Sequence, residues 1–166
     1  MADIDNLYSD DEKIIEEITN KILQNQDLLK FIHYLDNNID IPSQTNLTKE
    51  QRKNLINEKI FKYQKMDLTS GNTGCYLAYD LGDCSYDDYG NWIQIEVNFW
   101  ILCDVSYLQT FNGVRTRAIS QCLRNSFHKK TDLKNFKMAM IKRESPIGVG
   151  SYTGRLVKLV LFNSVK

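Results

Sequence analysis

The fold of this chain is decided by the stretch Trp92-Ile93-Gln94-Ile95-Glu96-Val97-Asn98-Phe99-Trp100-Ile101-Leu102-Cys103-Asp104. Apolar residues recur at every second position from Ile93 to Cys103, and mostly polar residues stand between them. Only an extended strand places alternate side chains on one side, so the stretch predicts a long strand over a core. Trp100 and Leu102 join the polar face, and an apolar patch on a half-solvated face predicts a docking surface.

The composition is that of a globular protein. The chain has 166 residues, of which 42% are hydrophobic, and this suits one domain with a sizeable core, residues 1–166. The 21 Lys and Arg residues balance the 21 Asp and Glu residues, so the net charge of zero gives no argument for nucleic acid or an anionic membrane. We recognise no secretory signal and no apolar stretch of membrane-spanning length. We therefore expect a soluble protein without a membrane partner, made in a reducing cytoplasm.

Four cysteines are spread along the chain without CxxC spacing: Cys75, Cys84, Cys103 and Cys122. Three of them lie in apolar or strand-like segments. The simplest interpretation is that the thiols are buried as small hydrophobic groups. A disulfide between Cys75 and Cys84 across a hairpin is the less favoured alternative.

The charges are unevenly distributed along the chain. Residues 3–17 carry seven acidic side chains and one lysine, whereas the last third of the chain is rich in Arg and Lys. An acidic head and a basic tail either attract each other between copies or form ordinary solvated surface, and the second interpretation is favoured.

Three helices are predicted in a helical front, residues 1–58. The first begins at the capping box Ser9-Asp10-Asp11-Glu12, and an apolar stripe at helical spacing continues it from about residue 10 to 25. The second is shorter and covers Leu28 to Leu35. The third opens at Thr48, where the capping-box pattern repeats, and reaches about Glu58.

Residues 74–163 are the predicted sheet-forming part. A strand at Cys75–Leu81 is followed by a loop at Gly82–Asn91 and then by the long strand described above. Two more strands, near Phe136–Arg143 and Gly154–Asn163, close the chain and are joined by a glycine-bearing loop.

An amphipathic helix is predicted from about Asn112 to His128, between the two pairs of strands. Its apolar residues recur at helical spacing, and its outward face is predicted to carry Arg115, Arg117 and Arg124. The fold class is therefore α+β, with N-terminal helices followed by a four-stranded, mainly antiparallel sheet (ββαββ) and a crossover helix packed on one face.

No combination of residues assembles a catalytic or metal site. The acidic loop after Asp83 resembles a calcium loop, but Asp88 and Gln94 stand where that pattern needs glycine and glutamate. Cys122 and His128 are six residues apart on one helix and therefore point to different sides. We expect no enzyme, no cofactor and no metal.

A nucleic-acid-associated accessory protein is the alternative function. The basic crossover helix and the residues after it would meet phosphates through Arg115, Arg117, Arg124, Lys129 and Lys130. The zero net charge and the lack of a recognisable RNP, KH or helix-turn-helix signature argue against it.

The layout resembles the tail terminator and tail-completion proteins of tailed phages, which are small α+β subunits of the ring between neck and tail tube. The resemblance is carried by the N-terminal helical segment, the motif Lys59–Lys65, the long strand Trp92–Asp104, the crossover helix Val114–Phe127 and the closing stretch Arg155–Phe162. It implies a non-enzymatic virion subunit in a ring of identical copies, commonly a hexamer. Such a ring caps the tail tube or joins tail to head, with other neck and tail-tube proteins as partners.

The subunit interface follows from the two unlike faces that a ring subunit needs. An acidic N-terminal helix and a basic crossover helix supply such a pair, and we expect the arginines to contact acidic groups of a neighbour. The loops 67–74, 82–91 and 144–153 are expected to become ordered on assembly, with tyrosines as anchors. The candidate interface residues are Arg115, Arg117, Arg124, Trp100, Tyr86, Tyr89 and Tyr152.

Overall fold

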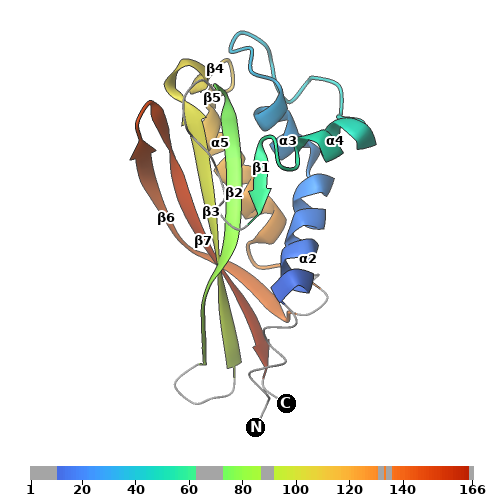
Figure 1. The fold of residues 1–166 in the computed structure, drawn as a ribbon, viewed down its shortest axis with the longest axis vertical. Coiled ribbons are helices and arrows are strands. Elements are labelled where there is room, and N and C mark those ends of the chain that lie inside the picture. The colour runs from blue at the N-terminus through green and yellow to red at the C-terminus, as the bar shows by residue number, and fades with distance from the viewer. Residues whose placement is uncertain (1–10, 63–72, 87–91, 131–132, 134–135, 165–166) are drawn as a thin grey trace.

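The fold consists of one sheet with helices on one of its faces (Figure 1). The structure is a computed structural model that describes residues 11–62, 73–86, 92–130, 133 and 136–164. The sheet has five strands in the order β1-β2-β3-β7-β6. Its strands are β1 (Ile60–Lys62), β2 (Cys75–Tyr86), β3 (Trp92–Asp104), β6 (Met138–Val149) and β7 (Tyr152–Ser164).

The helices lie close to their predicted places, and local capping explains several of their ends. They are α2 (Asp11–Gln24), α3 (Gln26–His33), α4 (Lys49–Leu55) and α5 (Arg115–Phe127). The predicted capping box of α4 is confirmed, because the Thr48 side chain accepts from Gln51 N and the Gln51 side chain accepts from Thr48 N. The capping box at Ser9 lies outside the described residues.

The prediction of a four-stranded sheet is wrong in one strand. β1 pairs with β2 in parallel, with Ile60 opposite Leu77, whereas the other pairs in the sheet are antiparallel. The sheet is therefore mixed, although the α+β class and the N-terminal helices are confirmed. A strand of only three residues is too short to show the alternation by which strands are recognised in a sequence.

Two of the segments predicted as loops, 82–91 and 144–153, contain more strand than expected. β2 continues to Tyr86, and a shift in its register with β3 between Leu81 and Cys84 accommodates the residues that looked like a loop. The segment 144–153 was predicted as a mobile loop, but most of it belongs to β6 and β7, which meet in a tight turn with Gly150 at φ +59°. Pro146 is tolerated there because β6 is an edge strand.

The crossover helix begins three residues later than predicted. The segment before it forms a small hairpin of β4 (Gln109–Thr110) and β5 (Gly113–Val114), after the short 3-10 helix η1 (Val105–Tyr107). Gly113 at the turn has a φ of +101°, which side-chain-bearing residues rarely adopt and which a helix does not allow.

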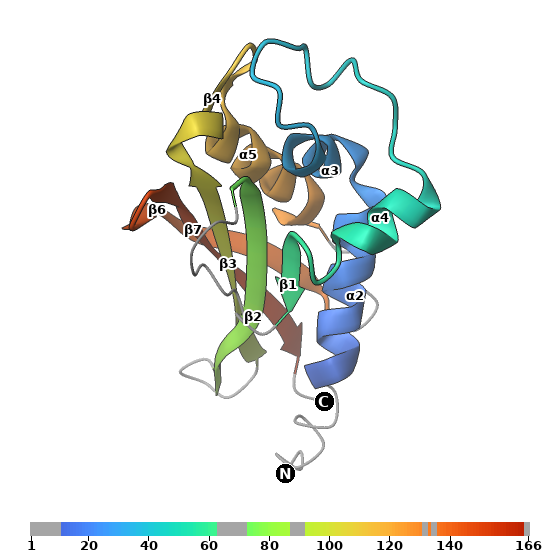
Figure 2. The ribbon, with the colours of Figure 1, turned by 45° about the horizontal axis from the view of Figure 1, so that its top comes forward.

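The main core lies between the sheet and the helices α2, α3 and α5, which gather on one side of the sheet (Figure 2). The alternation predicted for β3 is confirmed, because Ile95, Val97, Phe99, Ile101 and Cys103 are all buried in this core. α2 and α3 pack over β2, whereas α5 packs over β3, β7 and β6. The two long helices α2 and α5 therefore cover different halves of the sheet.

The sheet is longer than the layer of helices that covers it. The first residues of β2, Cys75–Tyr79, are buried, whereas Gly82–Tyr86 of the same strand are exposed. Figure 1 shows the lower ends of β2, β3 and β7 extending beyond α2. We call Gly82–Tyr86 and the β6–β7 turn, residues 147–151, the projecting ends of the sheet, and the part under the helices its covered centre.

Candidate interaction surfaces

Arg115 is the most buried of the predicted interface residues, with 0% of its surface exposed. Its Nε donates to Tyr107 O at 2.8 Å, and its Nη1 donates to Phe31 O and Tyr34 O, both at 2.7 Å. The guanidinium therefore binds carbonyl groups at the C-terminal end of α3 and ties this helix to α5. The prediction that Arg115 lies on the outward face of the crossover helix is wrong, and a neighbouring subunit has no access to it.

The spacing of residues in α5 indicates that Arg115 is buried. Arg115, Ile119 and Leu123 follow one another at intervals of four, so they lie on the same face of the helix. Ile119 and Leu123 are fully buried, and Arg115 shares their burial. The type of side chain favoured an exposed position, but its place in the helical period indicated a buried one.

The other two arginines of α5 are accessible to different degrees. Arg117 is exposed. The Arg124 side chain is 37% exposed, and its Nη2 lies 3.4 Å from Glu144 Oε2, while Arg155 Nε donates to the other carboxylate oxygen. Although burial acts to raise the pKa of Glu144, the hydrogen bonds from Ser120, Arg155 and Arg124 hold it below its ordinary value. Arg124 therefore already has an acidic partner within its own chain.

The aromatic candidates lie in three different environments. Tyr86 is 44% exposed at the end of β2. Trp100 is half-buried on the sheet face opposite the helices, where it pairs with Leu156. Tyr152 is wrongly predicted as a loop residue, because it lies in β7 and is buried in a small cluster with Tyr76 and Leu102.

Tyr89, the remaining tyrosine candidate, lies outside the described residues. The Tyr152 and Tyr76 rings stand edge to face at 6.0 Å between centroids, so Tyr152 supports this small cluster and does not act as a free anchor. Leu102, which was predicted to be exposed beside Trp100, is also buried in this cluster.

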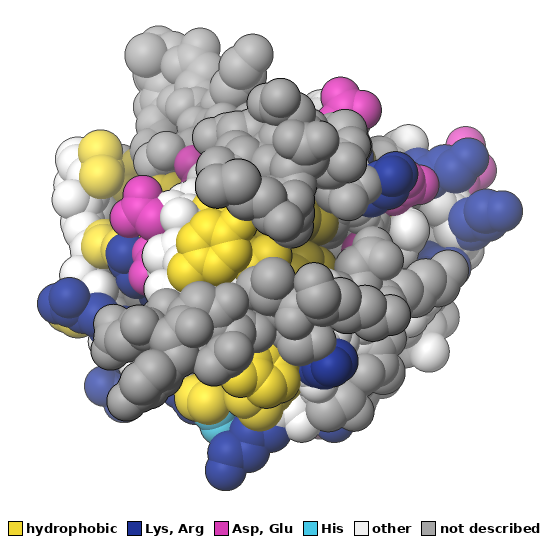
Figure 3. All heavy atoms as spheres, turned by 90° about the horizontal axis from the view of Figure 1, so that it is seen from below, with side chains coloured by type: hydrophobic (Ala, Val, Ile, Leu, Met, Phe, Trp, Pro, Cys, Tyr) yellow, Lys and Arg dark blue, Asp and Glu magenta, His cyan; other side chains and the backbone are white. Residues whose placement is uncertain are grey.

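Exposed apolar side chains gather at the two ends of the sheet. Tyr86 and Trp92 lie at the lower end, and Figure 3 shows hydrophobic side chains at the surface of that end, among residues that the structure does not describe. Val105 and Val149 are exposed at the opposite end, where Val105 N donates to Ser151 O in the β6–β7 turn. Phe111, in the turn between β4 and β5, is 73% exposed.

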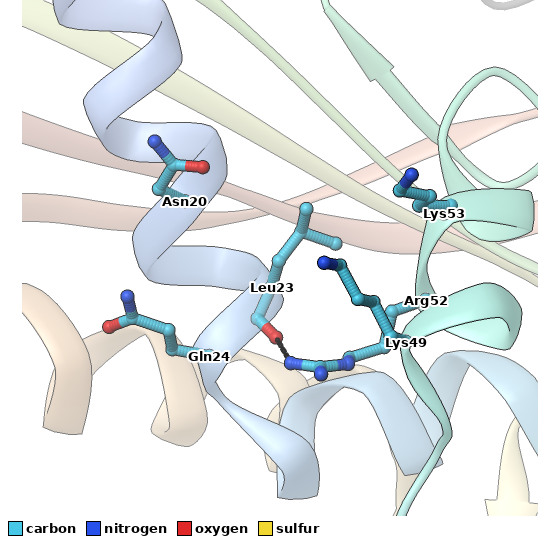
Figure 4. Close-up of a pocket in the computed structure, with 6 residues that line it drawn as sticks. All are labelled: Asn20, Leu23, Gln24, Lys49, Arg52 and Lys53. Atoms are coloured by element: carbon cyan, nitrogen blue, oxygen red, sulfur yellow. Dashed lines mark hydrogen bonds between the residues drawn. The ribbon is translucent and has the colours of Figure 1, made fainter.

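A pocket of about 310 Å³ lies between α2 and α4. Its lining consists of Asn20, Leu23, Gln24, Lys49, Arg52 and Lys53. Arg52 Nη1 donates to Leu23 O at 3.0 Å, and Figure 4 shows Asn20 and Gln24 pointing away from α4. The three cations all come from one helix, and Arg52 is already bound to a carbonyl of α2, so the lining lacks the convergent polar groups of a ligand site.

The described residues contain no group of three or more His, Cys, Asp or Glu side chains that would hold a metal ion. Burial, with a smaller contribution from Asp27, raises the pKa of the Cys122 thiol to about 11. His128, the residue considered with Cys122 as a candidate for nucleophilic chemistry, accepts a hydrogen bond at Nδ1 from Ile141 N at 3.2 Å. Neither group is arranged for nucleophilic chemistry.

In the part of the chain that the structure describes, no helix is long and apolar enough to span a membrane.

The chain matches a known protein family. Residues 25–158 match the model of a family described as YomW, which is most of the chain. The chain belongs to the YomW family. This family name is phage-derived, so the chain is a phage-related protein. No curated protein matches it.

The match to YomW begins at the turn before α3 and ends within β7. It includes Arg115, the residues Phe31 and Tyr34 whose carbonyls accept hydrogen bonds from Arg115, and the whole of β3. The acidic helix α2 precedes the matched residues. The family assignment therefore rests on the part of this YomW chain that contains the sheet and the crossover helix.

Proposed function

We propose that this chain is a non-enzymatic structural subunit of a phage particle, which assembles head to tail into a ring such as a hexamer. The ring ends the tail tube or joins tail to head, and the protein is made in the host cytoplasm. The observation that carries this proposal is the placement of two unlike charged helices, acidic α2 and basic α5, over different halves of one sheet. Head-to-tail contacts that close by rotation need such a pair of different surfaces.

Part of the charge on each helix is accessible, although Arg115 of α5 is buried and Arg124 is paired with Glu144. Glu12 and Glu16 are exposed on α2, which packs over β2 near the β1 edge of the sheet. Arg117 is exposed on α5, which packs over β3, β7 and β6 near the opposite edge. Complementary charges of this kind set the orientation and the rate of association more than its strength.

The apolar ends of the sheet support contacts with other proteins of the particle. A ring in a neck or tail has neighbours above and below it, so each subunit needs contact surfaces at two opposite ends. Val105 and Val149 at one end and Tyr86 and Trp92 at the other are exposed apolar residues of the kind that bind partners.

The outer edge of the sheet is not built to recruit another strand. β6 is an edge strand that carries a register shift between Ile141 and Arg143, an exposed Lys142 and Pro146. These features discourage strand-to-strand pairing between copies. We therefore expect subunits to associate through side chains of the helices and not through a continuous sheet.

The test is the mass of the protein in solution, measured by light scattering across concentration at low and high salt. We expect the natural chain to grow towards a closed ring, less so at high salt. The variant Arg117→Glu/Arg124→Gln should stay monomeric. Lys49→Glu/Lys53→Gln changes the net charge equally on α4 and should assemble like the natural chain.

A second variant, Glu12→Lys/Glu16→Lys, tests whether the two faces meet. Alone it should also stay monomeric, and mixed with the Arg117→Glu/Arg124→Gln variant it should restore assembly in an alternating ring. A natural chain that remains monomeric at every concentration in low salt contradicts the proposal. The same holds for a basic-face variant that assembles normally.

The alternative function, a nucleic-acid-associated accessory protein, gains no support from an individual contact. Of the five basic residues that were expected to meet phosphates, Arg115 is buried and Arg124 is paired with Glu144. The remaining three are separated along the helix, with Arg117 in the first turn of α5 and Lys129 and Lys130 after its C-cap. These residues do not form a continuous basic surface along α5, so the ring remains the favoured function.

A further inference from the structure

Two buried cysteines lie opposite each other on the central strands of the sheet. Cys75 begins β2, Cys103 is the residue before the last of β3, and the register pairs them directly. Both side chains are 0% exposed and belong to the main core, so they point to the same face of the sheet. Both are free thiols. Cys84, the partner of Cys75 in the less favoured disulfide alternative, is a free and exposed thiol further along β2, so the expectation that all four thiols are buried is wrong for it.

The hydrogen bonds of the ladder define the geometry of this pair. Asp104 N donates to Gly74 O at 2.8 Å, so Gly74 and Asp104 form a hydrogen-bonded pair. In an antiparallel ladder the adjacent pair, Cys75 and Cys103, is then a non-hydrogen-bonded pair, whose Cα atoms are roughly 4.5 Å apart and whose side chains approach each other closely. A disulfide requires a Cα separation of about 4.4–6.8 Å, so the two strands already hold this pair within reach of a bond.

The two thiols interact with each other and with two nearby cations. The Cys75 thiol donates a hydrogen bond to Cys103 sulfur, and this bond, with the positive charges of Arg115 and Lys59, lowers the pKa of Cys103 despite its burial. Burial raises the pKa of Cys75. Of the two sulfurs, Cys103 is therefore the more readily deprotonated and Cys75 the one that more readily keeps its proton.

We propose that Cys75 and Cys103 are a modification site, at which a peroxide oxidant closes a disulfide between β2 and β3. The Cys103 thiolate attacks one oxygen of hydrogen peroxide, the O–O bond breaks, and a sulfenic acid and hydroxide form. Cys75 sulfur then attacks the sulfenic sulfur, the S–O bond breaks, and water leaves. Two thiols lose two electrons and two protons, and one hydrogen peroxide becomes two water molecules.

The position of the pair in the sheet allows a small oxidant to reach it. Cys75 and Cys103 lie at the ends of their strands, and Thr73, two residues before Cys75, is exposed. Because both sulfurs lie in the covered centre, the oxidant reaches them only when the chain between the exposed Thr73 and Cys75 opens locally. A molecule as small as hydrogen peroxide then has access to sulfurs that a bulky reagent does not reach.

The disulfide braces the covered centre of the sheet. It closes the chain between Cys75 and Cys103 into a loop that includes the projecting end of β2 and the start of β3. Closing such a loop restricts the unfolded chain and therefore raises the stability of the folded one. The site stays reduced in a reducing cytoplasm and closes when the protein meets an oxidising environment. This inference does not rest on the proposed ring.

The test uses the full chain carrying Cys84→Ser and Cys122→Ser, so that only the pair remains. The folded protein is incubated with hydrogen peroxide and digested with a protease that cleaves after glutamate, because Glu96 separates the two cysteines. We expect a cross-linked peptide that dithiothreitol releases. We also expect the melting temperature to rise by roughly 5–10 °C on oxidation and to return on reduction.

Two controls keep the result interpretable. Adding Cys103→Ala to the same chain should abolish both the cross-link and the shift in melting temperature between untreated and treated protein. In the natural chain, oxidation of the exposed Cys84 shows that the peroxide is active. The proposal is overturned if the pair stays reduced while Cys84 is oxidised, or if the cross-linked chain melts at the same temperature as the reduced one.

Discussion

The covered centre of the sheet and its projecting ends differ in what holds them together. Cys75–Tyr79 at the start of β2 are buried under the helices, whereas Gly82–Tyr86 of the same strand are exposed and are held by their pairing with β3. Both parts belong to one strand, whose pairing with β3 shifts register between Leu81 and Cys84. The comparison shows that pairing with β3 sets how long β2 is, while the helices decide which part of it becomes core.

The two regions should therefore respond differently to substitution. Buried apolar side chains in the covered centre each contribute about 1.5–3 kcal/mol through their removal from water. Exposed strand ends lack this contribution and open at a lower cost, which leaves them available for contact with other proteins. Three pairs of matched substitutions compare buried positions with exposed ones, from the largest expected effect to the smallest.

Replacement of Gly154 should have the largest effect. A Cβ at this position in β7 would lie 1.8 Å from Ile101 O of β3. Because this oxygen belongs to the backbone, the two strands would have to move apart. We expect Gly154→Ala to lower the free energy of unfolding by at least about 4 kcal/mol in urea denaturation.

Gly148→Ala in a projecting end is the control. A Cβ at Gly148 meets its nearest atom, Tyr152 O, at 3.7 Å, which is ordinary contact. This variant should unfold within about 0.5 kcal/mol of the natural chain. Equal losses for both alanines would show that the two regions do not differ in packing.

Truncation of Arg115 should have the next largest effect. Arg115→Ala leaves the buried carbonyls of Phe31, Tyr34 and Tyr107 without the guanidinium that binds them. We expect a loss of about 3 kcal/mol in the free energy of unfolding, since each buried acceptor left unsatisfied costs about 1 kcal/mol or more.

Arg117→Ala, two residues further along the same helix, removes an exposed side chain and should change stability by less than about 0.5 kcal/mol. Chemical denaturation of both variants checks the difference. If Arg117→Ala is the more damaging of the two, the assignment of Arg115 as the link between α3 and α5 is wrong.

Removal of one tyrosine hydroxyl should have the smallest effect. The Tyr79 hydroxyl lies 2.6 Å from Thr19 Oγ1, which itself donates to Ile15 O, so this bond joins β2 to α2 inside the core. Tyr79→Phe should cost about 1 kcal/mol in thermal or urea unfolding. Tyr86→Phe, on the exposed part of the same strand, should leave the unfolding curve unchanged, and a comparable loss there would contradict the division of β2.

The sequence allowed much of the fold to be predicted because its strongest patterns are local. The alternation in β3 predicted both its bounds and its buried face, and capping residues placed the start of α4. β1 was not predicted, because a strand of three residues is too short to show the alternation of a strand. The lower half of β2 was not predicted either, because its polar residues are typical of a loop. Partner strands stabilise both segments, and a single segment does not reveal its partner.

The candidate site was less predictable than the fold. Arg117 and Tyr86 are exposed as expected, but Arg115 and Tyr152 are buried, because carbonyls of α3 and a neighbouring aromatic cluster surround them. The type of side chain indicates only an average preference for the surface. Whether a particular arginine is buried depends on the acceptors that other segments bring to it.

The sequence by itself determined the α+β class, the long central strand, the helices and the uneven distribution of charge, since each depends on the order of neighbouring residues. Only the tertiary structure decided the parallel pairing of β1, the burial of Arg115 and the opposition of Cys75 and Cys103. Each of these joins residues that are distant in the chain. Their contacts form only when strand register and helix packing bring the segments together, and no local sequence pattern specifies which distant segments meet.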